Sequence, residues 1–175
     1  GGTHKTSTVY CQLVLGPWSL KQLQVAFPYM LYRNPPDFYK KSPILYQKAM
    51  ETMMEYYYVV GGLPRYLVVD KVKDRTDQIT PENAAKHSQT MLHALAEGKD
   101  FNDASKEKIL TQFFTLRAGE DKNGYNPTRR YATLDFVSPA AVRAIGKILL
   151  EKIHKDARWR GSDDASDVGL AFERI

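Results

Sequence analysis

The hydrophobic pattern of this chain breaks most sharply at Gly61-Gly62-Leu63-Pro64-Arg65-Tyr66-Leu67. Glycine ends a helix readily because it adopts backbone conformations that other residues avoid. Proline suits the first turn of a helix, where its missing N–H is not needed. The stretch therefore predicts a joint that sets one helix at a fixed angle to the next element and leaves backbone groups free to meet a ligand. An ordinary turn between two helices explains the same pattern equally well.

Upstream of this joint, the sequence predicts one strand and two helices. Residues 8–15 are mostly apolar, rich in β-forming residues and followed by Gly16-Pro17, which is typical of a buried strand. Ser19 is a suitable N-cap for the first helix. Ser42-Pro43 begins the second helix, which we expect to run to about Val60. Its wide apolar stripe predicts burial on more than one side.

Downstream of the joint, the pattern predicts further helices and one β-hairpin. Residues 65–73 favour a helix, although their apolar run would also suit a strand. Residues 80–98 predict a helix with few apolar positions, hence a surface helix. Residues 109–116 and 131–137 predict two strands joined by a long, turn-rich loop. Ser138-Pro139 then begins the last helix.

The composition excludes several classes of protein. The chain has 175 residues, of which 43% are hydrophobic and 26% are charged, as in an ordinary globular domain. No apolar run approaches the ~18–20 residues that cross a bilayer, so we expect no membrane partner. A single cysteine, Cys11, excludes a disulfide framework and a cysteine-rich zinc site. The net charge of +5 permits a nucleic-acid partner without requiring one.

Two short segments resemble parts of a nucleotide site, and neither satisfies the chemistry. Residues 1–7 look like a phosphate-binding loop, but His4 stands where the pattern needs glycine before Lys5. Residues 67–70 look like an apolar strand that delivers Asp70 to a metal ion, a pattern that arises often by chance. The four histidines are far apart and lack ligand spacing, so we predict no metal site and no catalytic residue.

Basic residues follow one face of the last predicted helix. Arg143, Lys147 and Arg158 recur at spacings that suit a phosphate backbone, and Arg129 and Arg130 on the hairpin would extend the patch. These five residues are the candidate nucleic-acid-binding site. A solvated helix face is the alternative interpretation.

The joint also carries a family resemblance. Residues 58–67, Tyr-Val-Val-Gly-Gly-Leu-Pro-Arg-Tyr-Leu, resemble the Gly-Gly-hydrophobic-Pro-Arg-Tyr motif at the start of the helical lid in AAA+/STAND-like P-loop ATPases. The flanks look most like retrotransposon hot spot proteins and Crinkler effectors. Phe136-Val137-Ser138-Pro139 and Gly169-Leu170-Ala171-Phe172-Glu173 follow in the order that this family has them. The resemblance spans residues 8–175, and only the joint is specific.

The resemblance implies a nucleotide site at the joint. Gly61, Gly62 and Pro64 would line the adenine pocket, and Arg65 would sense phosphate. ATP and Mg²⁺ would bind the full-length parent, because the Walker motifs are missing here and we expect an ATPase core upstream. The chain is thus expected to be a fragment that does not hydrolyse ATP alone. The alternative is a basic nucleic-acid-binding or protein-interaction module without nucleotide.

The predicted fold class is α+β and predominantly helical, with one N-terminal strand, a helical lid-like bundle, and a β-hairpin packed with a C-terminal helix. We expect four regions: the end of an ATPase-core-like region with the long helix (1–60), a lid-like region (61–100), a small α+β region of winged type (101–160), and a tail that begins the next element (161–175). The resemblance implies an intracellular, nuclear location. The oligomeric state stays open.

Overall fold

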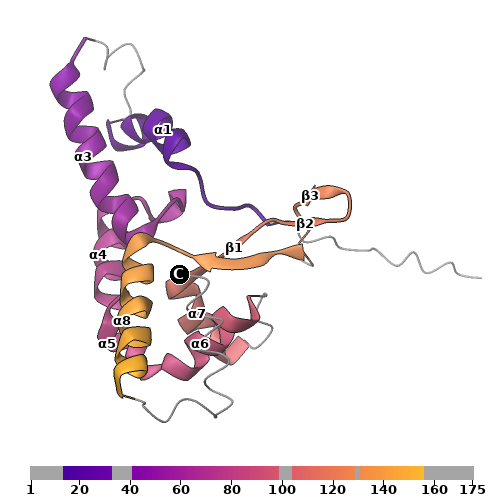
Figure 1. Ribbon diagram of the computed structural model, residues 1–175. Helices are drawn as coiled ribbons and strands as arrows, with labels where there is room; N and C mark the ends of the chain where they lie inside the picture. The colour runs from indigo at the N-terminus through magenta and orange to yellow at the C-terminus, as the bar shows by residue number, and fades with distance from the viewer. Residues whose placement is uncertain (1–13, 33–40, 99–103, 129–130, 156–175) are drawn as a thin grey trace, which may run out of the picture.

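The structure is a computed structural model that describes residues 14–32, 41–98, 104–128 and 131–155 (Figure 1). It is α+β and predominantly helical, as the sequence predicts. The predicted strand 8–15 lies almost wholly outside the described residues, and its last two, Val14 and Leu15, are in neither strand nor helix. None of the described helices combines the length and the apolar content that crossing a bilayer requires.

The elements are α1 (Leu20–Tyr32), α3 (Pro43–Val60), the 3-10 turn η1 (Pro64–Tyr66), α4 (Val69–Gln78), α5 (Pro81–Lys86), α6 (Ser88–Glu97), α7 (Ala104–Phe113), β1 (Phe114–Arg117), β2 (Gly119–Asp121), β3 (Gly124–Asn126), β4 (Thr133–Phe136) and α8 (Pro139–Lys155).

Helices α1 and α3 pack on each other and form the smaller of two hydrophobic cores. Ser19 caps α1 as predicted, because its hydroxyl accepts from the amide of Gln22 (3.3 Å) while the Gln22 side chain accepts from the Ser19 amide (2.8 Å). Phe27 of α1 meets Tyr56 of α3 edge to face, with ring centroids 5.8 Å apart. The core consists of Leu23, Phe27, Met53, Val60 and Leu67.

Helix α3 begins and ends where the sequence predicts, but it is not buried on several sides. Its buried positions are Ala49, Met53 and Val60, which form one stripe. Tyr46 and Met54, which belong to the wide apolar stripe that predicted this burial, are exposed. Met50, Tyr56 and Tyr57 are only partly buried, and they pack against the edge of the smaller core.

The larger core lies between α8, the helices α5 to α7, and the base of the hairpin. The predicted surface helix 80–98 is in fact two helices, α5 and α6, and Met91 and Leu95 of α6 are fully buried. The expectation was wrong because alanine positions complete the buried face that Met91 and Leu95 begin. Gly98 ends α6 in the left-handed conformation (φ 62°), as predicted.

The first predicted hairpin strand was placed too early. Residues up to Phe113 belong to α7, and the strand β1 starts only at Phe114. Leu110 and Phe113 are three residues apart, so a helix turns both into the larger core, where each is almost fully buried. This burial overrides the β preference of the apolar run.

The predicted long hairpin is present and packs against α8 (Figure 1). Strands β1 and β4 pair antiparallel from Phe114 opposite Phe136 to Arg117 opposite Thr133, and Arg117 forms an ion pair with Asp135. Strands β2 and β3 continue as a second antiparallel pair at the tip. Ser138 caps α8, with its hydroxyl accepting from the amide of Ala141 (3.3 Å).

The hairpin tip holds a carboxylate whose protonation can be measured. The side-chain amide of Asn126 donates to Asp121 (2.6 Å) and so does the backbone amide of Asn123 (2.7 Å), and together they hold the pKa of Asp121 below its ordinary value, Asn126 contributing most. Because the folded pKa lies below the unfolded one, this interaction stabilises the fold above the unfolded pKa and is lost as pH falls through the folded pKa.

We expect Asn126→Ala to raise the Asp121 pKa in a carboxyl NMR titration. Asn123→Ala is the control, since its backbone donor remains and the depressed pKa should persist; equal pKa values in both variants would contradict the assignment.

Candidate functional site

The joint between α3 and η1 packs directly against the junction between β4 and α8. Gly61 has φ 63° and ψ −150°, a conformation that is essentially restricted to glycine, and its amide donates to the carbonyl of Tyr57 (2.8 Å). A Cβ at this position would lie 1.8 Å from the carbonyl oxygen of Val137. Gly61 is therefore required both by its own conformation and by the backbone that packs against it.

The second glycine packs against the segment that precedes α1. The amide of Trp18 donates to the carbonyl of Gly62 (2.7 Å), and a Cβ on Gly62 would lie 2.1 Å from the Trp18 carbonyl oxygen. The amide of Val14, four residues earlier, donates to the carbonyl of Pro127 (2.8 Å) beyond the hairpin tip. The segment 14–18 thus connects the joint to the hairpin, as Figure 1 shows.

The joint contacts both hydrophobic cores. Val60 and Leu67 on either side belong to the smaller core, whereas Leu63 between them packs against the larger one. The joint is therefore a connection between two packed bodies, and the two glycines let three backbone segments approach closely there. An ordinary interhelical turn would need neither backbone approach.

The exposed side of the joint presents the ring of Pro64 and the positive charge of Arg65. Pro64 is half-buried and Arg65 is exposed. The Arg65 guanidinium lies 4.8 Å from the centre of the Tyr66 ring, and that of Arg75 from α4 lies 4.6 Å from the same ring. Arg75 also reaches the carbonyl of Thr111 in α7 at 3.5 Å. Tyr66 thereby links the joint to the larger body.

The chemistry that the joint offers to a ligand is limited. Pro64 offers an apolar surface to a base, and Arg65 offers a charge to a phosphate. The amides of Gly61, Tyr66 and Leu67 already donate to carbonyls of the chain, so they do not form a phosphate cradle. The four predicted residues lie together, and they offer one apolar surface and one cation.

The other nucleotide-like segments contribute nothing to this site. Asp70 lies in the first turn of α4, not at the end of a strand, so the resemblance of residues 67–70 to a metal-binding strand end is contradicted. The glycine-containing segment 1–7 lies outside the described residues. Within the described residues, no group of three or more His, Cys, Asp or Glu side chains could hold a metal ion.

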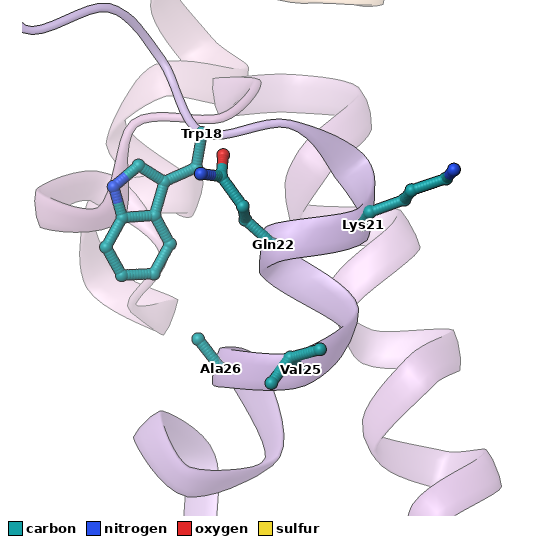
Figure 2. Close-up of a pocket in the computed structure, with 5 residues that line it drawn as sticks. All are labelled: Trp18, Lys21, Gln22, Val25 and Ala26. Atoms are coloured by element: carbon teal, nitrogen blue, oxygen red, sulfur yellow. The ribbon is translucent and has the colours of Figure 1, made fainter.

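Next to the joint, Trp18 and one face of α1 border a shallow apolar hollow of about 450 Å³ that is widely open to solvent (Figure 2). The indole lies beside the first turns of α1, with Gln22 and Ala26 on its side of the helix and Lys21 extending away from it. Val25, which also lines the hollow, is exposed, and Trp18 is partly exposed. The backbone of Trp18 thus holds Gly62 while its side chain shapes the adjacent surface.

Two of the five predicted nucleic-acid-binding residues are described, and both lie on a concave surface. Arg143 and Lys147 line a cleft of about 660 Å³ between α8 and the helices α3 to α5. The hydroxyl of Tyr58 lies 3.5 Å from the Arg143 guanidinium, and this contact raises the pKa of Arg143 further above its ordinary value. Arg129, Arg130 and Arg158 lie outside the described residues.

Comparisons with known proteins add no relative. A scan against protein-family models found no match, and searches of the curated proteins and of the solved structures found no significant match. The site is therefore interpreted from its own geometry and from the sequence resemblance.

Several residues of the site were not predicted from the sequence. Trp18 and Val137 meet the joint through their backbones, which leaves no signature in side-chain pattern. Tyr66 lay within the quoted motif, but its partner Arg75 is nine residues on and shows no periodic relation to it. Gly146 was a visible signal, since a glycine inside a strongly predicted helix calls for a reason.

Proposed function

We propose that this chain is the lid region of a P-loop NTPase of the kind found in retrotransposon hot spot and Crinkler-type proteins. In this proposal, an ATPase core outside residues 1–175 carries the Walker motifs, ATP and Mg²⁺. Gly61, Gly62, Pro64 and Arg65 border the nucleotide. The chain alone is not catalytic, and its role is to convert nucleotide state into a position of the lid.

The observation that carries this proposal is the clamped glycine joint between two cores. A signal that moved Pro64 or Arg65 would reach the β4–α8 junction through Gly61 and the segment 14–18 through Gly62, because both glycines touch backbone. Hinges between packed bodies are the usual means of domain closure around a ligand. The Arg65–Tyr66–Arg75 stack gives the same joint a second contact with the body that contains α7.

Arg65→Ala in the complete native protein tests the proposal. We expect kcat for ATP hydrolysis to fall at least about tenfold, since a guanidinium that meets a transferring phosphate contributes strongly to its stabilisation. We expect Pro64→Ala to raise KM for ATP, because it removes apolar surface from the base side. The isolated chain should bind ATP weakly or not at all, and adding the upstream core should restore binding.

Lys71→Ala is the matched control, because Lys71 is an exposed cation on α4 that does not belong to the joint. Its activity should equal that of the unchanged protein. If Arg65→Ala and Pro64→Ala hydrolyse ATP at the unchanged rate, the roles assigned to the joint are wrong. If the native species has the mass of this chain and no NTPase core accompanies it, the proposed function fails as a whole.

The alternative from the sequence, a nucleic-acid-binding module, rests on Arg143 and Lys147 among the described residues. Both are exposed, and the structure gives neither an ion pair with a described carboxylate. They lie, however, in a cleft rather than on a convex helix face.

A further inference from the structure

The cleft beside α8 has the size and the mixed lining of a small-molecule site. Its volume of about 660 Å³ falls within the roughly 300–1,000 Å³ range of ligand pockets. Val59 of α3, Ile79 at the end of α4 and Ala140 of α8 contribute apolar surface. Leu150, at the far end of the cleft, is exposed and would be covered by a bound apolar group.

One stripe of α8 supplies both the charge and the space. Gly146, Lys147 and Leu150 stand three, four and seven residues after Arg143, so the four residues share one face of the helix. Arg143 and Lys147 are one turn apart and can meet the same anion. No carboxylate is among the residues that line the cleft, whereas Arg143 and Lys147 are both cations.

Gly146 is not explained by packing. It lies well inside α8, where glycine makes a helix less stable than alanine does. A Cβ at Gly146 would meet nothing within 4 Å, in contrast to Gly61 and Gly62. The missing side chain therefore leaves room in the cleft that no neighbouring group fills.

Tyr58 holds one of the two cations at the mouth of the cleft. Its hydroxyl is 3.5 Å from the Arg143 guanidinium, so this contact joins α8 to α3. The guanidinium keeps further donors for an anion, since it has five N–H groups in a fixed plane. Tyr58 itself lines the cleft and adds an aromatic surface beside the charge.

We propose that this cleft binds a small amphipathic anion, namely a compact apolar or aromatic body that carries one phosphate or carboxylate group. The apolar body lies against Val59, Ala140 and the open space at Gly146. The anionic group meets Arg143 and Lys147. This inference does not rest on the NTPase assignment, because the cleft and the joint share no proposed ligand contact.

Isothermal titration of the full chain with 1-naphthyl phosphate tests the proposal, with 1-naphthoate, 1-naphthol and inorganic phosphate as parallel probes. We expect 1-naphthyl phosphate or 1-naphthoate to bind at least about tenfold more tightly than either the neutral naphthol or free phosphate. The ratio of the dissociation constants of 1-naphthyl phosphate and 1-naphthoate shows whether the cleft prefers a phosphate or a carboxylate. Arg143→Gln with Lys147→Gln should weaken binding at least tenfold.

The space at Gly146 is tested separately from the charge. Gly146→Leu should also weaken binding at least tenfold by filling the cleft, and Gly146→Ala should raise the melting temperature while weakening binding less. The control is Lys48→Gln with Lys71→Gln, which removes the same charge from exposed positions of α3 and α4 outside the cleft. This control should bind the probe like the unchanged chain.

Three results would overturn the proposal. One is equally tight binding of the neutral naphthol, which would leave Arg143 and Lys147 without a role. Another is unchanged binding in both the charge variant and Gly146→Ala, whose fold is not at risk. The third is no binding of any naphthyl probe, together with retardation of duplex DNA that falls steeply with salt and is lost in the charge variant, which would assign these cations to nucleic acid.

Discussion

Gly61→Ala is expected to lower the free energy of unfolding by about 4 kcal/mol, which is large for a single methyl group. The backbone at φ 63° and ψ −150° costs a residue with a Cβ about 1–3 kcal/mol. The new carbon would also lie 1.8 Å from the Val137 carbonyl oxygen, so α3 and the β4–α8 junction must separate. Forcing extra atoms into a packed contact adds about 1–3 kcal/mol.

Urea denaturation followed by circular dichroism measures this loss, and two other glycines provide matched comparisons. Gly62→Ala should also destabilise strongly, because its Cβ would lie 2.1 Å from the Trp18 carbonyl oxygen. Gly146→Ala should have the opposite sign and stabilise by about 0.5–1 kcal/mol, since it removes a glycine from a helix interior into open space. Equal midpoints for Gly61→Ala and Gly146→Ala would show that the joint is not clamped.

The comparison of these glycines explains what the sequence could and could not predict. Ser19, Ser42 with Pro43, and Ser138 with Pro139 were sufficient to predict the starts of α1, α3 and α8, because caps act within one turn. The break at Gly61 was equally local. The contacts of Gly61 with Val137 and of Gly62 with Trp18 were not predictable. They join residues that are 76 and 44 positions apart in the sequence, and they are made by backbone atoms.

The errors have the same physical origin. Residues 109–113 have β-forming side chains, yet they form the end of α7 because Leu110 and Phe113 reach the larger core only from a helix. Residues 80–98 looked too polar to be buried, yet α6 buries Met91 and Leu95. In both cases burial in the larger core determined the secondary structure or the burial of the segment, and local residue preference had only a weak influence.

The candidate sites likewise divide into a part that local sequence predicts and a part that only tertiary packing creates. Gly61, Gly62, Pro64 and Arg65 are consecutive, so a motif sufficed to place them together. The cleft at α8 combines Tyr58, Ile79 and Lys147 from three helices, and only the packing of those helices brings them to one surface. Sequence pattern had placed Arg143 and Lys147 on one helix face, but not the aromatic and apolar groups that turn this face into a cleft.

Phe113→Ala is expected to lower the free energy of unfolding by about 3–5 kcal/mol, the usual cost of emptying a core position of this size. Phe113 is fully buried in the larger core, where α7, β1 and α8 meet. Phe27→Ala removes an equally buried ring from the smaller core, together with its edge-to-face contact with Tyr56. The two substitutions have the same chemistry, so the regions in which each one speeds amide exchange report whether the two cores open together across the Gly61-Gly62 joint.

Amide hydrogen exchange measured by mass spectrometry distinguishes the two cases. If the joint connects two bodies that open separately, Phe27→Ala should speed exchange in α1 and α3 and leave α6 and α8 protected, because local opening follows contiguous cooperative units. Phe113→Ala should speed exchange in α6, α7, β1, β4 and α8. A lid that changes position requires such a division, since a bistable element must move as a body. Uniform loss of protection in both variants would instead make the chain one cooperative unit, and the joint would then fix α3 against α8 rather than allow them to move.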